Sequence, residues 1–318
     1  MVTVQTLRGP VDINKLGETM MHEHVFFQYD EKWREKSVQF SVEKLENLAK
    51  AGGQTLVDVG PNPRRNINWY QEIADRTDLN IIVSTGFYTE PKTPIEFRQM
   101  NILEMQARFI KELTEGIGDS KIRAGVIKVA GRKAQLTPWE IDVMRAAACV
   151  QKETGVPICT HACEGARSQF DVLVEAGADP ERLYFSHIEA EFGWEGRTLR
   201  QELEHLLTIV REGGSLFFNN FTFEFDTPEE DMMYLMHALC DKGYANRVLF
   251  GIDMNYTIED QGTIWLESQQ EHPEVIVRDF AYTYTGAIPI MRKWGFTDEH
   301  FRIFLVENPR RIFGATRI

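Results

Sequence analysis

The feature that most constrains the fold of this chain is an alternation, repeated eight times, of a short apolar run with a longer stretch of helical apolar spacing. The runs expected to form strands cover 19–24, 55–59, 80–85, 125–129, 156–161, 183–187, 215–220 and 247–253. Helices are expected at 42–51, 66–77, 94–115, 138–153, 165–177, 196–212 and 228–243, and near 276–294 and 298–307. Strict alternation predicts a parallel sheet, and eight strands fit an α/β fold of the closed (β/α)8, or TIM, barrel type.

Two segments lie outside the repeating pattern. Residues 1–15 are expected to add a small hairpin ahead of the first strand, and residues 254–275 a long loop after the last one. No Pro/Ser-rich linker, low-complexity tract or long charge run interrupts the series. We therefore expect a single domain over residues 1–318, which is long enough to bury a large core.

The charge of the chain excludes some partners. Its 48 acidic and 35 basic side chains give a net charge of -13, which repels nucleic acid and anionic membrane surfaces. The start has no signal-peptide pattern, and no apolar stretch approaches the length of a membrane span. The four cysteines fall in apolar segments, which favours reduced thiols. These observations predict a soluble cytoplasmic protein with a small-molecule substrate, and a homodimer is compatible with them.

Metal-ligating residue types gather at the ends of the expected strands, where the active sites of such barrels lie. The residues are His22 and His24 on the first strand, Lys128 on the fourth, His161 on the fifth, His187 on the sixth and Asp253 on the eighth. Side chains two residues apart on a strand face the same side, so one ion could bind both rings of the His-x-His pair. A single strand-end histidine is more often a hydrogen-bonded core residue. Four of the eight histidines at such positions, with an aspartate, instead predict a metal centre.

The expected ligands leave the identity of the metal open. Imidazole and carboxylate suit zinc, which is our first expectation, as well as cobalt, manganese or iron. Lys128 could instead be a strand-end lysine that reaches solvent. Cys159 and Cys163 flank His161 and could supply thiolates, although the Cys-x3-Cys spacing lacks the second pair of many zinc sites.

The sequence resembles the phosphotriesterase family of the amidohydrolase superfamily from about residue 2 to 314. The resemblance is carried by the expected metal ligands and by the closing segment Glu307-Asn308-Pro309-Arg310-Arg311-Ile312-Phe313. The resemblance implies two divalent ions. His22, His24 and Asp253 would hold one ion, and His161 and His187 the other. Lys128, carboxylated by CO2, would bridge them. Such a carbamate is an anionic bidentate ligand, whereas an unmodified lysine would add positive charge beside two dications.

The resemblance also implies hydrolysis by a hydroxide shared between the two ions, while one ion polarises the bond under attack. Asp253 would be a ligand and also the catalytic group that accepts the proton of the attacking water. Asp58 could orient a histidine ligand, or be an ordinary buried aspartate. Glu189 could take part in a proton relay. The chain departs from family members by its segment Ile188-Glu189-Ala190-Glu191-Phe192 and by the lack of an arginine after the seventh strand.

Three residues are expected to contact the substrate. Tyr88, in Thr85-Gly86-Phe87-Tyr88, matches a family position near the hydroxide and could bond the leaving oxygen, or simply pack in the mouth. Arg65 could bind a carboxylate or phosphate group, although a solvated loop charge is the plainer interpretation. Asn220 ends the seventh expected strand and is the third expected contact.

Four functions compete at this point. The first expectation is hydrolysis of a lactone, carboxylic ester or amide, and the alternative is hydrolysis of a phosphotriester. A deaminase with a single metal ion is a third hypothesis, against which Lys128 argues. The fourth is a noncatalytic binding protein that retains the barrel. No Gly-x-Ser-x-Gly elbow, Walker loop or dinucleotide fingerprint offers a competing chemistry.

Overall fold

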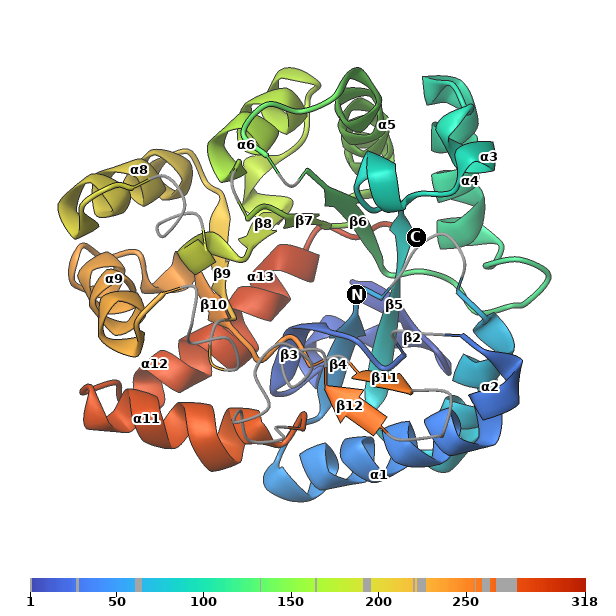
Figure 1. Cartoon of the computed structure of the whole chain (residues 1–318), viewed down its shortest axis with the longest axis horizontal. Coiled ribbons are helices and arrows are strands. Elements are labelled where there is room, and N and C mark those ends of the chain that lie inside the picture. Colours follow the sequence, from blue (N-terminus) through green and yellow to red (C-terminus); the bar gives the residue numbers. More distant parts are fainter. Residues whose placement is uncertain are drawn as a thin grey trace.

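The computed structural model confirms the predicted barrel (Figure 1). It describes residues 2–26, 29–60, 65–131, 133–163, 165–190, 196–219, 221, 227–254, 256–258, 264–266 and 279–318. The barrel strands are β3 (Thr19–Glu23), β4 (Thr55–Asp58), β5 (Asn80–Gly86), β6 (Val126–Ala130), β7 (Ile158–His161), β8 (Leu183–Ser186), β9 (Ser215–Phe218) and β10 (Val248–Phe250). Each strand pairs in parallel with the next one in sequence, so the chain winds once around a nearly closed barrel.

A side chain joins the first and last strands. Among the described residues no backbone ladder pairs β3 with β10, although the two strands are in contact. The buried carboxylate of Glu23 accepts hydrogen bonds from the backbone N–H groups of Ile252 at 3.2 Å and Met254 at 2.7 Å. The N–H of His24 donates to the carbonyl of Met254 at 3.1 Å. These bonds close the barrel where the ladder is missing.

Helices surround the strands (Figure 1). They are α1 (Arg34–Ala51), α2 (Ile67–Arg76), α3 (Ile95–Arg98), α4 (Ile102–Thr114), α5 (Pro138–Thr154), α6 (Ala166–Glu175), α8 (Leu199–Arg211), α9 (Glu229–Asp241), α11 (Ile288–Lys293), α12 (Asp298–Arg302) and α13 (Asn308–Phe313). Single turns of 3-10 helix occur at Ile13–Lys15, Glu31–Trp33, Glu90–Lys92, Pro180–Arg182 and Ala245–Arg247. Wider π turns at Thr283–Ala287 and Ile303–Glu307 lead into α11 and α13.

Capping boxes at helix N-termini explain why one predicted helix is confirmed and another is wrong. Thr137 and Glu140 form the capping box that starts α5 as expected. The helix expected over 94–115 is in fact two helices, because Asn101 and Glu104 form a second capping box that starts α4. The helix expected from residue 42 begins at Arg34, since the buried face continues through Val38.

Two apolar cores hold the layers together. The larger core lies between strands and helices. The smaller one fills the barrel with one residue from each of the eight strands: Met21, Val57, Ile82, Val126, Cys159, Tyr184, Phe217 and Leu249. Val4 of the N-terminal hairpin and Phe313 of α13 belong to this inner core and close one end of the barrel. The opposite end is left for the loops that follow the strands.

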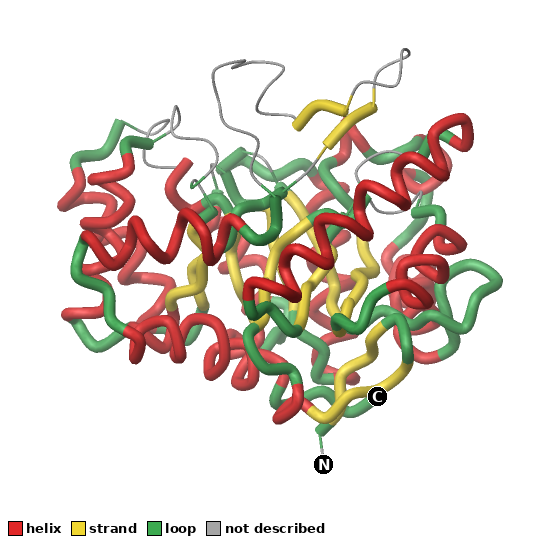
Figure 2. Tube along the Cα trace, turned by 90° about the horizontal axis from the view of Figure 1, so that it is seen from below, coloured by secondary structure: helices red, strands yellow, loops and turns green. Residues whose placement is uncertain are grey.

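The described parts of the two segments outside the repeat lie at opposite ends of the barrel (Figure 2). The predicted N-terminal hairpin is confirmed as β1 (Thr3–Thr6) paired antiparallel with β2 (Gly9–Asp12). The long final loop contains a pair that the sequence pattern missed, β11 (Tyr256–Ile258) with β12 (Ile264–Leu266). Three residues per strand are too few to give a readable alternation. None of the helices in the described ranges is long and apolar enough to cross a bilayer.

Candidate metal centre

The structure brings the predicted ligands to the barrel end opposite the N-terminal hairpin. His22 lies within β3, and His24 directly follows that strand. Lys128 lies within β6, and His161 is the last residue of β7. His187 directly follows β8, and Asp253 lies three residues beyond the end of β10. Parallel strands bring their carboxyl ends to the same end of a barrel. Residues far apart in the chain therefore converge there.

The carboxylate of Asp253 lies among three imidazoles. Its Oδ1 is 3.0 Å from Nε2 of His24 and 3.4 Å from Nε2 of His22, and its Oδ2 is 3.6 Å from Nε2 of His187. Ligand atoms of His22, His187 and Asp253 all lie within 4.8 Å of one another. Two imidazoles and a carboxylate at this separation fit one divalent ion.

A bulge in β3 turns the side chain of His22 toward the inside of the barrel. The pairing of β3 with β4 shifts register between Met20 and Glu23. Met21 belongs to the core inside the barrel, yet the next ring, His22, lies 5.5 Å from the ring of Phe217 in the same core. Two consecutive side chains face inward, which unbroken alternation does not allow and a bulge does. His24 lies two residues after His22, and the two ring centroids are 5.8 Å apart, so the pair is close as predicted.

The backbone at two expected ligands is strained. Within the described ranges, His187 (φ 63°) and Asp253 (φ 50°) are the only non-glycine residues with positive φ. A residue with a Cβ is rarely found in this left-handed region and stays there only when its surroundings hold it. Such strain is typical of functional sites. Its presence at two predicted ligands, which follow different strands, supports a shared role for them.

Asn219, directly after β9, holds His187 in place. Its Oδ1 accepts the backbone N–H of His187 at 2.9 Å, and its amide nitrogen lies 2.8 Å from Nδ1 of the same residue. The amide also donates to Oδ2 of Asp253 at 3.3 Å. The backbone N–H of Asn219 in turn donates to Oε1 of the buried Glu189 at 2.9 Å. Sequence reasoning missed Asn219, although a polar residue at a strand end was a usable signal.

A second group lies beside the first. The rings of His161 and His187 are 4.3 Å apart, and Sγ of Cys163 lies 3.2 Å from Nε2 of His161. Ligand atoms of these three residues lie within 4.8 Å of one another. The hydroxyl of Tyr88 is 3.1 Å from the same Nε2. His187 belongs to both groups, so two ions held here would be neighbours.

Lys128 is buried. It is 3% exposed, which excludes the alternative of a lysine that reaches solvent. Its Nζ lies 3.4 Å from Sγ of Cys159, and none of the described carboxylates forms an ion pair with it. A buried ammonium without a counter-charge is costly. Conversion to an anionic carbamate would remove that cost, so the environment of Lys128 fits the predicted modification.

The ionisation of the cluster suits metal binding. Burial, and then the nearby charge of Lys128, hold the pKa of His22 well below its usual value. Burial also lowers the pKa of His187 to about 4, although Asp253 opposes this. Burial alone would raise the pKa of Asp253, but His22 and His24 bring it well below the usual range. The rings of His22 and His187 are therefore neutral and the Asp253 carboxylate is ionised, which are the forms that bind metal.

Asp58 and Arg65 form a separate buried network. Oδ2 of Asp58 accepts from the hydroxyl of Tyr70 at 2.8 Å and from the N–H of Val25 at 3.0 Å, while Oδ1 lies 3.3 Å from Arg65. Arg65 also donates to the carbonyl of Ser84 at 2.9 Å. Burial opposes the charge of Arg65, but Tyr70 and Asp58 outweigh it and raise its pKa. These contacts favour the ordinary buried aspartate over a partner of a histidine ligand.

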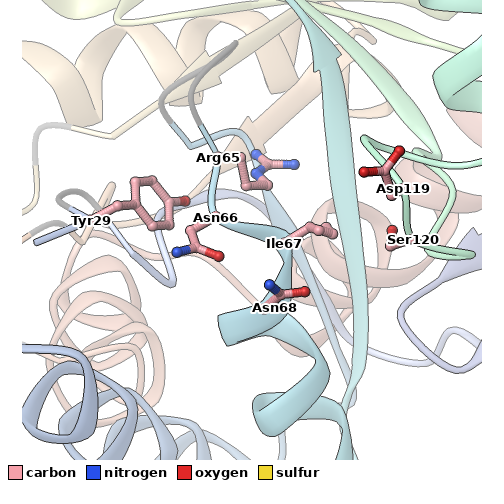
Figure 3. A pocket seen from close by; sticks show the side chains of 7 residues that line it. All are labelled: Tyr29, Arg65, Asn66, Ile67, Asn68, Asp119 and Ser120. Carbon is pink, nitrogen blue, oxygen red and sulfur yellow. The ribbon is translucent and has the colours of Figure 1, made fainter. Parts of the chain in front are cut away.

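Arg65 also borders an open pocket of about 530 Å³ (Figure 3). The pocket is lined by Tyr29, Arg65, Asn66, Ile67, Asn68, Asp119 and Ser120. None of the expected metal ligands is among its lining residues. The pocket is not the expected catalytic site, because neither of the two ligand groups found among the described residues lines it. Asn220, the third expected substrate contact, lies outside the described residues.

Comparison with known proteins places this arrangement in a family. The phosphotriesterase family model matches residues 2–313. A phosphotriesterase homology protein from Mycobacterium tuberculosis (strain ATCC 25618 / H37Rv) is 30% identical over 336 residues, which cover 98% of each chain. The N-acetyltaurine hydrolase of Mus musculus is 24% identical over 357 residues, which cover 97% of each chain.

A solved structure has the same architecture. It is described as organophosphate hydrolysis activity engineered from a weak promiscuous lactonase template. Its TM-score to this chain is 0.83 at 29% identity, and the match covers 98% of this chain and 100% of the other. The match to the family model over nearly the whole sequence, with this fold, shows that the chain belongs to the phosphotriesterase family of metal-dependent hydrolases, which act on small molecules.

Proposed function

We propose that this protein is a hydrolase with two metal ions that cleaves a lactone, carboxylic ester or amide. The observation that carries the proposal is the pair of ligand groups that share His187, beside the buried Lys128. A site with one ion would need neither the second group nor an anionic form of the lysine. The deaminase alternative leaves both unexplained.

The expected ligands would divide between two ions. His22, His24 and Asp253 would hold one ion, His161 and His187 would hold the other, and a carbamate on Lys128 would be a ligand of both. Zinc is the first expectation, and cobalt, manganese and iron fit the same donors. When bound, such ions supply Lewis acidity and lower the pKa of water.

Asp253 is the proposed acceptor of the proton from the attacking water. Its low pKa keeps it ionised, and the carboxylate faces the shared space between the imidazoles. As the water oxygen bonds to the substrate carbonyl carbon, Asp253 accepts the water proton. The bond to the leaving oxygen or nitrogen then breaks, and the proton passes to that atom or to solvent.

Tyr88 is the best placed of the expected substrate contacts. Its hydroxyl lies 3.1 Å from Nε2 of His161 in the second ligand group. If that nitrogen binds an ion, the hydroxyl is released to bond the leaving oxygen of the substrate. Asn220, the residue after Asn219 in the sequence, stays a predicted substrate contact.

Arg65 would contact the substrate only through the open pocket that it lines. Its guanidinium is hydrogen-bonded to Asp58 and Ser84, so it would bind only an anionic group that extends from the substrate into that pocket. Such a contact would be made by a part of the substrate other than the reacting bond.

The relatives support a carbonyl substrate. The mouse relative is named for hydrolysis of an N-acetyl compound, and the structural neighbour derives from a lactonase. The same neighbour was engineered for organophosphate hydrolysis, so phosphotriester hydrolysis is the second candidate.

A substrate panel separates the candidates. Metal-loaded protein should turn over lactones or acyl amides faster than aryl phosphotriesters, and a chelator should abolish the activity until metal is restored. Asp253→Asn provides a matched variant with nearly the same shape, which should lose turnover of every substrate. Faster phosphotriester turnover would favour the second candidate. Turnover that persists without metal would contradict both.

A further inference from the structure

We propose that Cys163 is a sulfur ligand of the ion held by His161 and His187. The inference rests on the proposed centre and goes further, because it makes the two metal sites chemically different. One site would have two nitrogens and a carboxylate oxygen, and the other two nitrogens and a sulfur.

The geometry comes close to what a metal ion requires. Sγ of Cys163 lies 3.2 Å from Nε2 of His161, and the ligand atoms of Cys163, His161 and His187 all lie within 4.8 Å of one another. Zinc bonds of about 2.3 Å to sulfur and 2.0–2.1 Å to nitrogen, at a tetrahedral angle, separate the two donors by roughly 3.6 Å. Small adjustments of the side chains would reach this separation.

The local chain explains why the thiol is there. His161 ends β7, and Cys163 follows it by two residues in the loop at the mouth. The side chain is 7% exposed, so it is turned into the protein rather than toward solvent. The strand end that positions His161 therefore positions Cys163 as well.

The neighbouring thiol of Cys159 does not fit this role. Its Sγ lies 3.7 Å from Nδ1 of His22, whereas Nε2 of that ring faces Asp253. Cys159 therefore lies behind the His22 ring, on the side away from the shared carboxylate. Cys163 instead contacts Nε2 of His161, on the side that faces its own ligand group.

A thiolate would bias the metal preference of this site. When the sulfur–metal bond forms, the thiol proton passes to solvent. Soft sulfur favours zinc over manganese or magnesium, which prefer oxygen ligands. We therefore expect zinc or cobalt to fill both sites and manganese to bind more weakly at the site of Cys163.

Cobalt reports sulfur ligation directly. Protein loaded with two cobalt(II) ions should show a sulfur-to-cobalt charge-transfer absorption in the near ultraviolet. Cys163→Ser should lose this absorption while cobalt still binds at the other site. Cys159→Ser and Cys149→Ser, the second at an exposed cysteine, should keep it. Cobalt content is measured in each sample.

A measurement on the unaltered chain covers the case in which Cys163→Ser fails to fold. Metal loading should protect Cys163 from alkylation in the native protein, as measured by mass spectrometry, while Cys149 reacts equally with and without metal. An absorption that persists in folded Cys163→Ser, or its absence from wild type with two ions bound, would overturn the assignment and leave the proposed function intact. Failure of wild type to bind any cobalt would instead overturn the proposed function.

Discussion

His187 is the residue on which the two ligand groups depend. It faces Asp253 on one side and the ring of His161 on the other, from a backbone with φ of 63°. Asn219 contacts both its backbone N–H and its ring. Residues that support a ligand in this way usually matter nearly as much as the ligand.

The protonation of His187 gives a prediction for pH. In the metal-free protein its imidazole should stay neutral until the pH falls to about 4, because burial disfavours the charged ring. An NMR pH titration of the imidazole nitrogens, assigned with His187→Gln, measures this. A ring that titrates near the value of free histidine would contradict the described environment.

The sign of the linked stability follows from the same shift. The folded pKa lies below the unfolded one, so the unfolded state binds a proton first as the pH falls. The contribution of His187 is complete above the unfolded pKa and is lost as the pH falls toward about 4. Relative to His187→Gln, the free energy of unfolding should fall by about 1.4 kcal/mol per pH unit within that interval.

At the scale of elements, the seam between β3 and β10 links the barrel to the site. Glu23 lies between two expected ligands in sequence, and it binds the backbone N–H groups on either side of Asp253. It therefore holds the strained backbone of Asp253 through the two residues on either side of it. We regard it as a positioning residue.

Replacement of Glu23 tests this role. Glu23→Ala leaves two buried N–H groups without their acceptor, so the free energy of unfolding should fall by about 1–3 kcal/mol for each group. Metal affinity should fall as well, since Asp253 would no longer be held. Urea denaturation and metal titration of the same samples measure the two effects. Glu23→Gln retains one acceptor oxygen and should be intermediate; a Glu23→Ala variant with unchanged metal affinity would limit Glu23 to a structural role.

Gly86 tests how closely β5 must approach β6. Its φ is 117°, and an added Cβ would lie 1.9 Å from the carbonyl oxygen of Lys128. Gly9 has a similar φ of 105° with no heavy atom within 4 Å of such a Cβ, so it is a matched control for backbone strain. Gly86→Ala should lower the free energy of unfolding by about 1–3 kcal/mol more than Gly9→Ala does, and should weaken metal binding. Equal effects in urea denaturation and metal titration would show that the approach to Lys128 does not matter.

At the scale of the whole molecule, the barrel and the position of its site could be predicted from the sequence. Alternating apolar runs define the strands, and ligand residue types at their carboxyl ends define the mouth. The bulge in β3, the short pair β11–β12 and the division between α3 and α4 could not be read in this way. They depend on register and on local hydrogen bonds, which leave little trace in apolar periodicity.

The supporting residues escaped prediction for a related reason. Glu23 and Asn219 act through contacts with residues distant in sequence, so nothing near them in the chain reveals their partners. The two ends of the barrel also differ in the kind of side chain that they hold. The N-terminal hairpin and α13 close one end with apolar side chains, whereas the other holds the strained and titratable residues.

Metal counting tests the central claim most directly. Elemental analysis of wild type should find two divalent ions per chain, and native mass spectrometry should find the added mass of one CO2 that is absent from Lys128→Ala. That variant should lose metal and turnover together, while circular dichroism confirms that it is folded. One ion per wild-type chain, or full metal occupancy with unchanged turnover in Lys128→Ala, would contradict the account.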